Sequence, residues 1–178
     1  MPNREYQPKE AAPWKEHTTA SASASVFLSD DQGRLLMVQD IDAYGGKWSP
    51  IAGFVDVANN EEPEVAALRE AKEELGLDIR LDELLGVWHY YAEDGPKKSD
   101  EKTHMHVGYS YTGTILGGTY TMQKEEIQNY GFFTPTQIED MHRNGILKTP
   151  QYNYVGYKLW QAGTRHPLNV IQTNGTTH

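Results

Sequence analysis

Short apolar runs separated by polar turn residues occupy the first third of the chain. An apolar run at 26–28 is followed by Ser-Asp-Asp-Gln-Gly at 29–33, and a second apolar run covers 35–38. Runs of this length, joined by a turn that contains glycine, are typical of β-strands. We therefore predict a hairpin of two strands, followed by a glycine-bearing loop at 44–46 and an extended segment at 48–55.

Residues 62–76 carry the strongest helical pattern. Pro63 suits the first turn of a helix and Gly76 suits its end, because a left-handed residue often stops a helix. At about 100° per residue, one arc of the helix is apolar and can face a sheet, with Val65, Leu68, Ala71 and Leu75. The neighbouring arc, roughly 100° wide, holds three carboxylates, those of Glu70, Glu73 and Glu74.

Branched and aromatic residues return after this helix in three strand-like stretches, at 79–81, 84–91 and 105–116. The polar residues 93–102 are expected to form a solvated loop before the last stretch. A further strand is expected to end at Phe133. Thr134 or Thr136 can then cap a helix that runs to Arg143.

A last helix is expected at about 150–161, and no internal repeat or second domain is visible. We divide the chain into three parts: an N-terminal arm at 1–19, one domain at 20–165 and a C-terminal tail at 166–178. The arm contains three prolines but also Tyr6 and Trp14. Because large aromatic residues are enriched at interfaces, the arm favours a homodimer in which Trp14 is buried.

Composition and charge limit the possible functions. The chain has 178 residues, a net charge of −9 and no cysteine. A broad nucleic-acid surface needs a basic excess, and disulfides, thiolate nucleophiles and sulfur-ligated zinc need cysteine. No apolar run reaches the length of a membrane span, and the N-terminus lacks the apolar stretch of a signal peptide. We expect a cytoplasmic protein that acts on a small molecule.

The three glutamates allow two interpretations. Like charges at this spacing cost about 0.2–0.5 kcal/mol per pair on an isolated helix, and a bound divalent cation would offset that repulsion. Hard oxygen ligands favour Mg²⁺ or Mn²⁺ over zinc or copper. A solvated acidic face is the alternative. The string Arg-Glu-Ala-Lys-Glu-Glu-Leu-Gly at 69–76 is far rarer by chance than an acidic face, and it favours the metal site.

This stretch resembles the Nudix box, whose pattern is Gly, five residues, Glu, seven residues, Arg-Glu, an aliphatic residue, any residue, Glu-Glu, any residue, Gly and an aliphatic residue. The matching positions are Glu61, Arg69, Glu70, Ala71, Glu73, Glu74, Gly76 and Leu77. Gly53 matches in kind but lies two residues too far upstream of Glu61. The family usually has a glycine with positive φ just before the first Glu, and Asn59 or Asn60 can adopt that conformation.

The resemblance implies an α/β/α sandwich with a central mixed β-sheet and a catalytic strand–loop–helix. It also implies a metal-dependent hydrolase that cleaves the diphosphate linkage of a nucleoside diphosphate joined to another group. Glu70 and Glu74 would be the main metal ligands, with Glu73 and the carbonyl of Gly53 as further ligands. Arg69 would hold the carboxylates in place through charge-assisted hydrogen bonds.

A later carboxylate of the family usually lies about six residues before the end of a strand. Glu126 precedes Phe132 by that distance, and Glu125 is its neighbour. The expected role is a further metal ligand or the general base, although a plain surface acid is the alternative for both residues. We therefore take Glu73, Glu126 and Arg69 as the catalytic residues.

The sequence indicates the substrate less clearly than it indicates the metal site. Four aromatic residues are candidates for contact with a nucleobase, although each is also compatible with core packing: Tyr44, Trp48, Phe54 and Tyr90. His104 and His106 share one face of a strand and are interpreted as ordinary polar strand residues. We favour ADP-ribose or a nucleoside diphosphate sugar. The alternatives are a dinucleoside polyphosphate, an RNA 5′ end, and a nucleotide-binding domain without catalysis.

Overall fold

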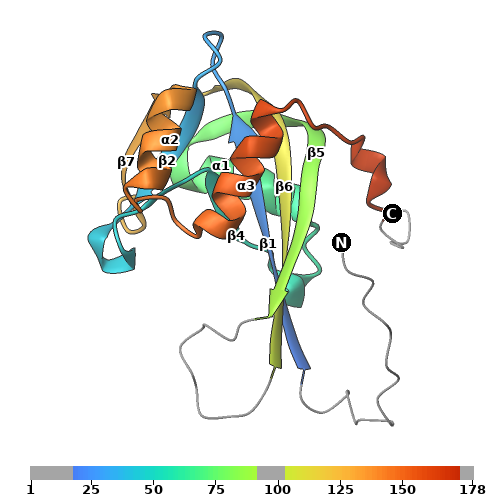
Figure 1. The fold of residues 1–178 in the computed structure, drawn as a ribbon. Helices are drawn as coiled ribbons and strands as arrows, with labels where there is room; N and C mark the ends of the chain where they lie inside the picture. Colours follow the sequence, from blue (N-terminus) through green and yellow to red (C-terminus); the bar gives the residue numbers. More distant parts are fainter. Residues whose placement is uncertain (1–17, 92–102, 173–178) are drawn as a thin grey trace.

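The computed structural model describes residues 18–91 and 103–172 (Figure 1). Their strands are β1 (Thr18–Leu28), β2 (Leu35–Asp40), β3 (Trp48–Ser49), β4 (Ile51–Phe54), β5 (Leu77–Tyr91), β6 (Thr103–Gly118) and β7 (Ile127–Phe133). Their α-helices are α1 (Pro63–Leu75), α2 (Pro135–Arg143) and α3 (Pro150–Gln161). Three 3₁₀ turns complete the order: η1 (Asp42–Tyr44), η2 (Val57–Asn59) and η3 (Leu168–Val170).

The strands form two sheets. The larger has the order β4-β1-β6-β5 and is mixed, because β1 runs parallel to β6 while the other pairs are antiparallel. The smaller is antiparallel, with the order β3-β2-β7. The predicted hairpin of β1 and β2 is therefore wrong. The two strands follow each other across the turn, but they enter different sheets and share only a bridge between Ser29 and Leu35.

Helices cover both faces of the sheets. Neighbouring residues of β1 point to opposite faces, as the period of two in a strand requires. Val26 lies in a core with Leu75 of α1, whereas Phe27 lies in a second core with Ile138 of α2 and Tyr157 of α3. Figure 1 shows α1 on one side of the strands and α2 and α3 on the other. The predicted α/β/α sandwich is confirmed, with the mixed sheet β4-β1-β6-β5 accompanied by a second, antiparallel sheet.

The helix α1 begins and ends where the sequence predicts. Pro63 occupies its first turn and Gly76 follows it with a φ of 69°. The predicted apolar arc is wrong in part, since Val65 and Leu68 are exposed. The buried face is shifted toward small residues and two carboxylates: Ala66, Ala67, Glu70, Ala71, Glu74 and Leu75. The helix therefore turns Glu70 and Glu74 inward rather than along a solvated edge.

The later helices also agree with the sequence. Thr134 caps α2 in a capping box with Gln137, and α3 has the predicted bounds. The segment predicted as a C-terminal tail begins with hydrogen bonds between His166 and Leu84 of β5, and Leu168 packs against the core. This segment therefore continues the packed structure up to Ile171.

Three expectations fall outside the described residues: the loop at 93–102, most of the arm at 1–19, and the homodimer argued from Tyr6 and Trp14. The dimer stays a prediction. Within 18–91 and 103–172, no helix is long and apolar enough to cross a membrane.

Candidate active site

Arg69 on α1 is the centre of a hydrogen-bond network. Its Nε and Nη2 donate to the two carboxylate oxygens of Glu61 at 2.7 and 3.0 Å. Its Nη1 donates to Glu70 Oε1 at 2.6 Å and to Glu73 Oε2 at 2.8 Å. Nη2 also donates to the carbonyl oxygen of Phe54 at 2.8 Å. The side-chain hydrogen bond to Glu61 raises the pKa of Arg69, so the guanidinium stays charged. Arg69 thus contacts three carboxylates and the strand before them.

Glu70 and Glu74 are buried carboxylates, with 8% and 4% of their surface exposed. Burial raises the pKa of Glu70, although the hydrogen bond from Arg69 opposes this. Burial raises the pKa of Glu74 well above its usual range, and the nearby charge of Glu70 adds to the effect. The Glu74 Oε2 atom accepts no hydrogen bond from the residues that the structure describes. An unpaired buried carboxylate oxygen is costly, so Glu74, which lies near the buried carboxylate of Glu70, favours a bound cation.

Gly53 on β4 lies directly against the carboxylate of Glu70. A Cβ atom at this position would lie 1.9 Å from Glu70 Oε1, a distance that real contacts do not reach. Glycine therefore lets the carboxylate approach the strand.

A single methyl group at this position tests that contact. The carboxylate of Glu70 ends a flexible side chain, so it can move away at little cost in stability. We expect Gly53→Ala to lower kcat by about tenfold, because catalytic groups tolerate only small displacements, with a small change in Tm. Gly117→Ala is the matched control, since a Cβ there meets nothing within 4 Å. Wild-type kcat in Gly53→Ala would contradict this role of the glycine.

The loop between β4 and α1 absorbs the extra residues before Glu61. Asp56 caps the turn η2 by accepting hydrogen bonds from Asn59, and its own N–H donates to Glu61 Oε2 at 2.7 Å. Asn60 then has a φ of 57°, which confirms the prediction that Asn59 or Asn60 takes the left-handed conformation. Despite the insertion, Glu61 therefore still accepts hydrogen bonds from Arg69.

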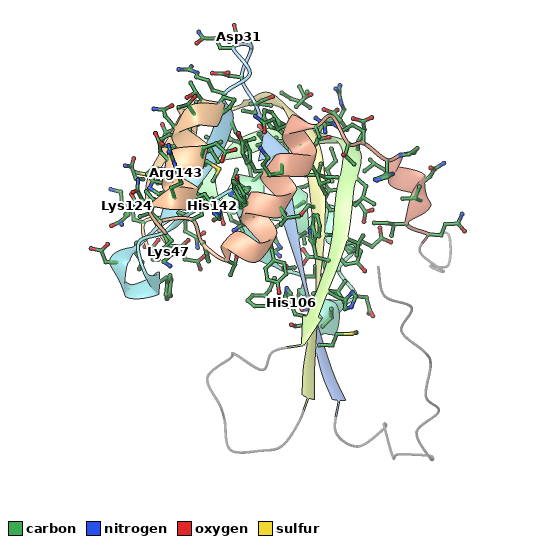
Figure 2. The ribbon with its side chains drawn as sticks, in the orientation of Figure 1. Asp31, Lys47, His106, Lys124, His142 and Arg143 are labelled. Atoms are coloured by element: carbon green, nitrogen blue, oxygen red, sulfur yellow. The ribbon has the colours of Figure 1, made fainter. Side chains whose placement is uncertain are left out.

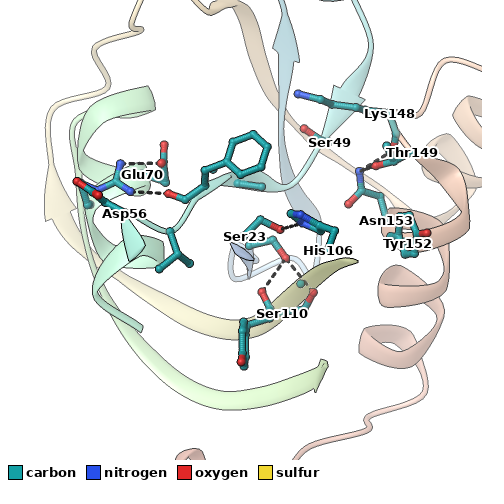
Figure 3. A pocket seen from close by; sticks show the side chains of 18 of the residues that line it. Ser23, Ser49, Asp56, Glu70, His106, Ser110, Lys148, Thr149, Tyr152 and Asn153 are labelled. Atoms are coloured by element: carbon teal, nitrogen blue, oxygen red, sulfur yellow. Dashed lines mark hydrogen bonds and ion pairs between the residues drawn. The ribbon is translucent and has the colours of Figure 1, made fainter. Parts of the chain in front are cut away.

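A cavity of about 960 Å³ opens beside these groups, a size suited to a nucleotide-sized ligand. Figure 3 shows its two ends: Glu70 and Asp56 lie at one, and Lys148, Thr149 and Asn153 lie at the other. The strands β1 and β6 form the floor between them, with Ser23, Ser110 and His106.

The NUDIX domain matches residues 19–151 of the sequence. The chain belongs to the Nudix family. This membership makes it a Nudix pyrophosphohydrolase in general terms, without fixing the substrate. No curated protein matches the sequence.

Solved structures agree with the family. The chain is similar to a NUDIX hydrolase from Nitrosomonas europaea, with a TM-score of 0.71 and 19% identity over 87% of this chain and 97% of that chain. It is also similar to the MutT protein from Methanosarcina mazei Go1, with a TM-score of 0.61 and 15% identity over 83% of this chain and 98% of that chain. A third similar structure is the NUDIX domain of Shewanella oneidensis NrtR complexed with ADP ribose. Its TM-score is 0.59, with 17% identity over 86% of this chain and 93% of that chain. At these identities, the likeness shows the fold alone.

The Nudix family typically uses a divalent metal, and the donor set of this site fits one. The side chains of Glu70, Glu73 and Glu74 offer hard oxygen donors, and Glu74 Oε2 lacks a partner within the described part of the chain. No three acidic or histidine side chains of residues 18–91 and 103–172 converge into a closed metal site. Glu70 and Glu73 each give one oxygen to Arg69, which leaves their other oxygen for a metal.

The structure separates the two candidate later acids. Glu126 lines the cavity, and its charge is among the causes that raise the pKa of Glu70, after burial. Glu125 does not line the cavity. Glu126 is therefore the acid that the Nudix fold brings to the carboxylates of α1.

The four aromatic candidates for substrate contact lie in different places. Phe54 lines the cavity with 68% of its surface exposed. Trp48 packs edge to face against Phe133, with ring centroids 4.8 Å apart, and does not line the cavity. Tyr44 is 62% exposed on η1, also away from the cavity. Tyr90 lies on β5, but its side chain is outside the described part of the structure. Only Phe54 stays in our proposal.

The sequence predicts an ordinary polar strand residue at His106, but the structure buries this side chain in the cavity floor. Its Nδ1 and Nε2 lie 2.6 and 2.8 Å from the hydroxyl oxygens of Ser21 and Ser23. Its ring meets the ring of Phe54 edge to face at 5.7 Å. In Figure 2 it lies well apart from His142, which is on α2. His106 thus supports the exposed aromatic ring beside the carboxylates.

Proposed function

We propose that this Nudix hydrolase cleaves the diphosphate linkage of ADP-ribose or of a nucleoside diphosphate sugar, with Mg²⁺ or Mn²⁺ as cofactor. The observation that carries the proposal is the cavity, which joins an acidic end to a floor of hydroxyl and aromatic groups. The acidic end suits a diphosphate with its cations. The rest is large enough for a nucleoside or a sugar.

Glu70, Glu73 and Glu74 would hold the metal, which supplies charge neutralisation of the diphosphate and activates a water molecule. Arg69 fixes the orientation of Glu70 and Glu73 through its Nη1 hydrogen bonds. Glu126 accepts the proton of the attacking water as general base. No covalent intermediate is needed, in agreement with the absence of cysteine.

The floor of the cavity provides contacts for the remaining part of the substrate. Phe54 offers an exposed ring on which a nucleobase can stack. The Ser25 and Ser110 hydroxyls lie 2.8 Å apart, and the Trp88 indole donates to Ser110 Oγ at 2.9 Å. Such a hydroxyl-rich surface suits the alcohol groups of ribose or another sugar. The NrtR domain, which has the same fold, was complexed with ADP ribose.

A panel of diphosphate compounds tests the proposal. With Mg²⁺ or Mn²⁺, we expect ADP-ribose to yield AMP and ribose 5-phosphate, or a nucleoside diphosphate sugar to yield a nucleoside monophosphate and a sugar phosphate. EDTA should abolish both reactions, because the buried carboxylates cannot neutralise a diphosphate alone. The products are separated by chromatography.

The panel also includes dinucleoside polyphosphates and 5′-capped RNA, which represent the alternative substrates. Cleavage of these compounds alone would overturn the substrate class. Calorimetry tests the alternative that the domain binds a nucleotide without hydrolysing it. Tight binding of ADP-ribose with Mg²⁺, without any product after hours, would overturn the enzymatic function.

A further inference from the structure

Lys148 lies across the cavity from the carboxylates of α1 (Figure 3). It belongs to the loop between α2 and α3. Its charge reaches Glu74, where it opposes the rise in pKa that burial causes. The side chain is about half exposed, at 46%, and it lines the cavity. A diphosphate held at the carboxylates would therefore have Lys148 on its other side.

Three contacts fix the position of Lys148. Its backbone N–H donates to the carbonyl oxygen of Trp48 at 2.8 Å. Its own carbonyl oxygen accepts from Nδ2 of Asn153 at 2.6 Å. The next residue, Thr149, has a φ of 40°, which is unfavourable for a β-branched residue, and its hydroxyl accepts from the same Asn153 amide at 3.1 Å. Such strain persists where surrounding contacts enforce it, often at functional sites.

Asp40 aims the ammonium group. The Lys148 Nζ lies 2.8 Å from Asp40 Oδ2, and the Asp40 side chain is only 6% exposed. Asp40 Oδ2 has no hydrogen-bond partner among the described residues, so its contact with Lys148 is an ion pair. An ammonium has three N–H donors, and these can turn toward the cavity. Asp40 itself does not line the cavity.

Charge decides what Lys148 can bind. Five carboxylates line the cavity, those of Asp56, Glu61, Glu70, Glu73 and Glu126. Among the described lining residues, Arg69 and Lys148 are the only lysine or arginine. Because Arg69 already donates to three carboxylates and a carbonyl group, Lys148 is the cation that faces an anionic ligand.

We propose that Lys148 forms an anion-binding subsite that contacts the diphosphate of the substrate from the side opposite α1, and that Asp40 is the residue that positions it. This inference rests on the proposed function. It adds a binding residue outside the Nudix box, on a segment more than 70 positions away from Glu74. A group that is fixed before the ligand arrives binds without a large ordering cost.

The test uses Lys148→Met, which keeps the length of the side chain and removes its charge. We expect kcat/KM on the hydrolysed substrate to fall about 10- to 30-fold, the lower part of the range for a hydrogen bond to a charged group. The Kd of α,β-methylene ADP, measured by calorimetry with Mg²⁺, should rise by a similar factor, while Lys148→Arg should bind nearly as the wild type does. Lys158→Met is the matched control, because Lys158 contacts Glu139 and Gln161 outside the cavity.

A double-mutant cycle tests the role of Asp40. Asp40→Asn should weaken binding of the same probe in the wild type, and it should have no further effect in Lys148→Met. An equal loss in both backgrounds would refute the positioning role. An unchanged Kd in Lys148→Met would refute the subsite. Because α,β-methylene ADP is a nucleoside diphosphate analogue whose binding is measured without hydrolysis, this result is separate from a failure to hydrolyse ADP-ribose.

Discussion

Replacement of Glu74 by Gln is expected to lower kcat at least about 100-fold, the scale on which loss of a metal ligand acts. Glu74 is the most buried of the three glutamates proposed as metal ligands, and its Oε2 has no partner among the described residues. Gln keeps the size of the side chain and removes the charge, so the change tests the carboxylate itself. The measurement is steady-state turnover of the substrate identified by the panel, at saturating Mg²⁺.

Glu62→Gln is the matched control, because Glu62 precedes the same helix, is exposed and makes no capping hydrogen bond. It should retain wild-type kcat. Full activity of Glu74→Gln would show that Glu74 is not a metal ligand.

Glu74→Gln should not lose stability in EDTA. Burial raises the pKa of Glu74 above the ordinary value of 4.5, so the folded state binds more protons than the unfolded state between the two pKa values. The contribution of Glu74 to stability is therefore present at low pH and is lost as the pH rises through the folded pKa. Glu74→Gln avoids this loss. Its Tm relative to the wild type should rise with pH above about 4.5.

Replacement of Glu126 by Gln is expected to lower kcat by about 100-fold or more, the contribution of a general base. Glu126 lines the cavity and acts electrostatically on Glu70, whereas its neighbour Glu125 does neither. Glu125→Gln is thus a control that differs by one position and should behave as the wild type does.

The Mg²⁺ dependence of Glu126→Gln separates the two roles considered for this residue. Loss of a base lowers kcat at the same Mg²⁺ requirement, and loss of a ligand raises the Mg²⁺ concentration for half-maximal activity. Equal losses in Glu125→Gln and Glu126→Gln would show that neither acid has a specific role.

The sequence predicts the parts of the site that depend on neighbouring residues. Pro63 and Gly76 mark the ends of α1 because proline and glycine have strong local backbone preferences. Asn60 takes the left-handed conformation for the same reason. The pairing of β1 was predicted wrongly, because its partner β6 lies far along the chain and local patterns do not specify such partners.

The opposite side of the cavity could not be predicted from local patterns. Lys148 belongs to a short loop with no motif, and only the folded chain brings it to the cavity that the carboxylates line. The floor did leave a signal. Ser21, Ser23 and Ser25 alternate with apolar residues along β1, which is typical of a strand with one polar face. Combined with His106 on another predicted strand, that pattern indicates a polar surface that a ligand can use.

The parallel pairing of β1 with β6 has a consequence for how the protein reaches its active form. The hydroxyl groups of Ser21 and Ser23 meet the ring of His106 across sequence separations of 85 and 83 residues. Contacts of such high order close large loops and form slowly, whereas α1 needs only its own residues and their neighbours. The acidic helix can therefore form early in folding, and the floor of the cavity is completed only when the second half of the chain has been synthesised.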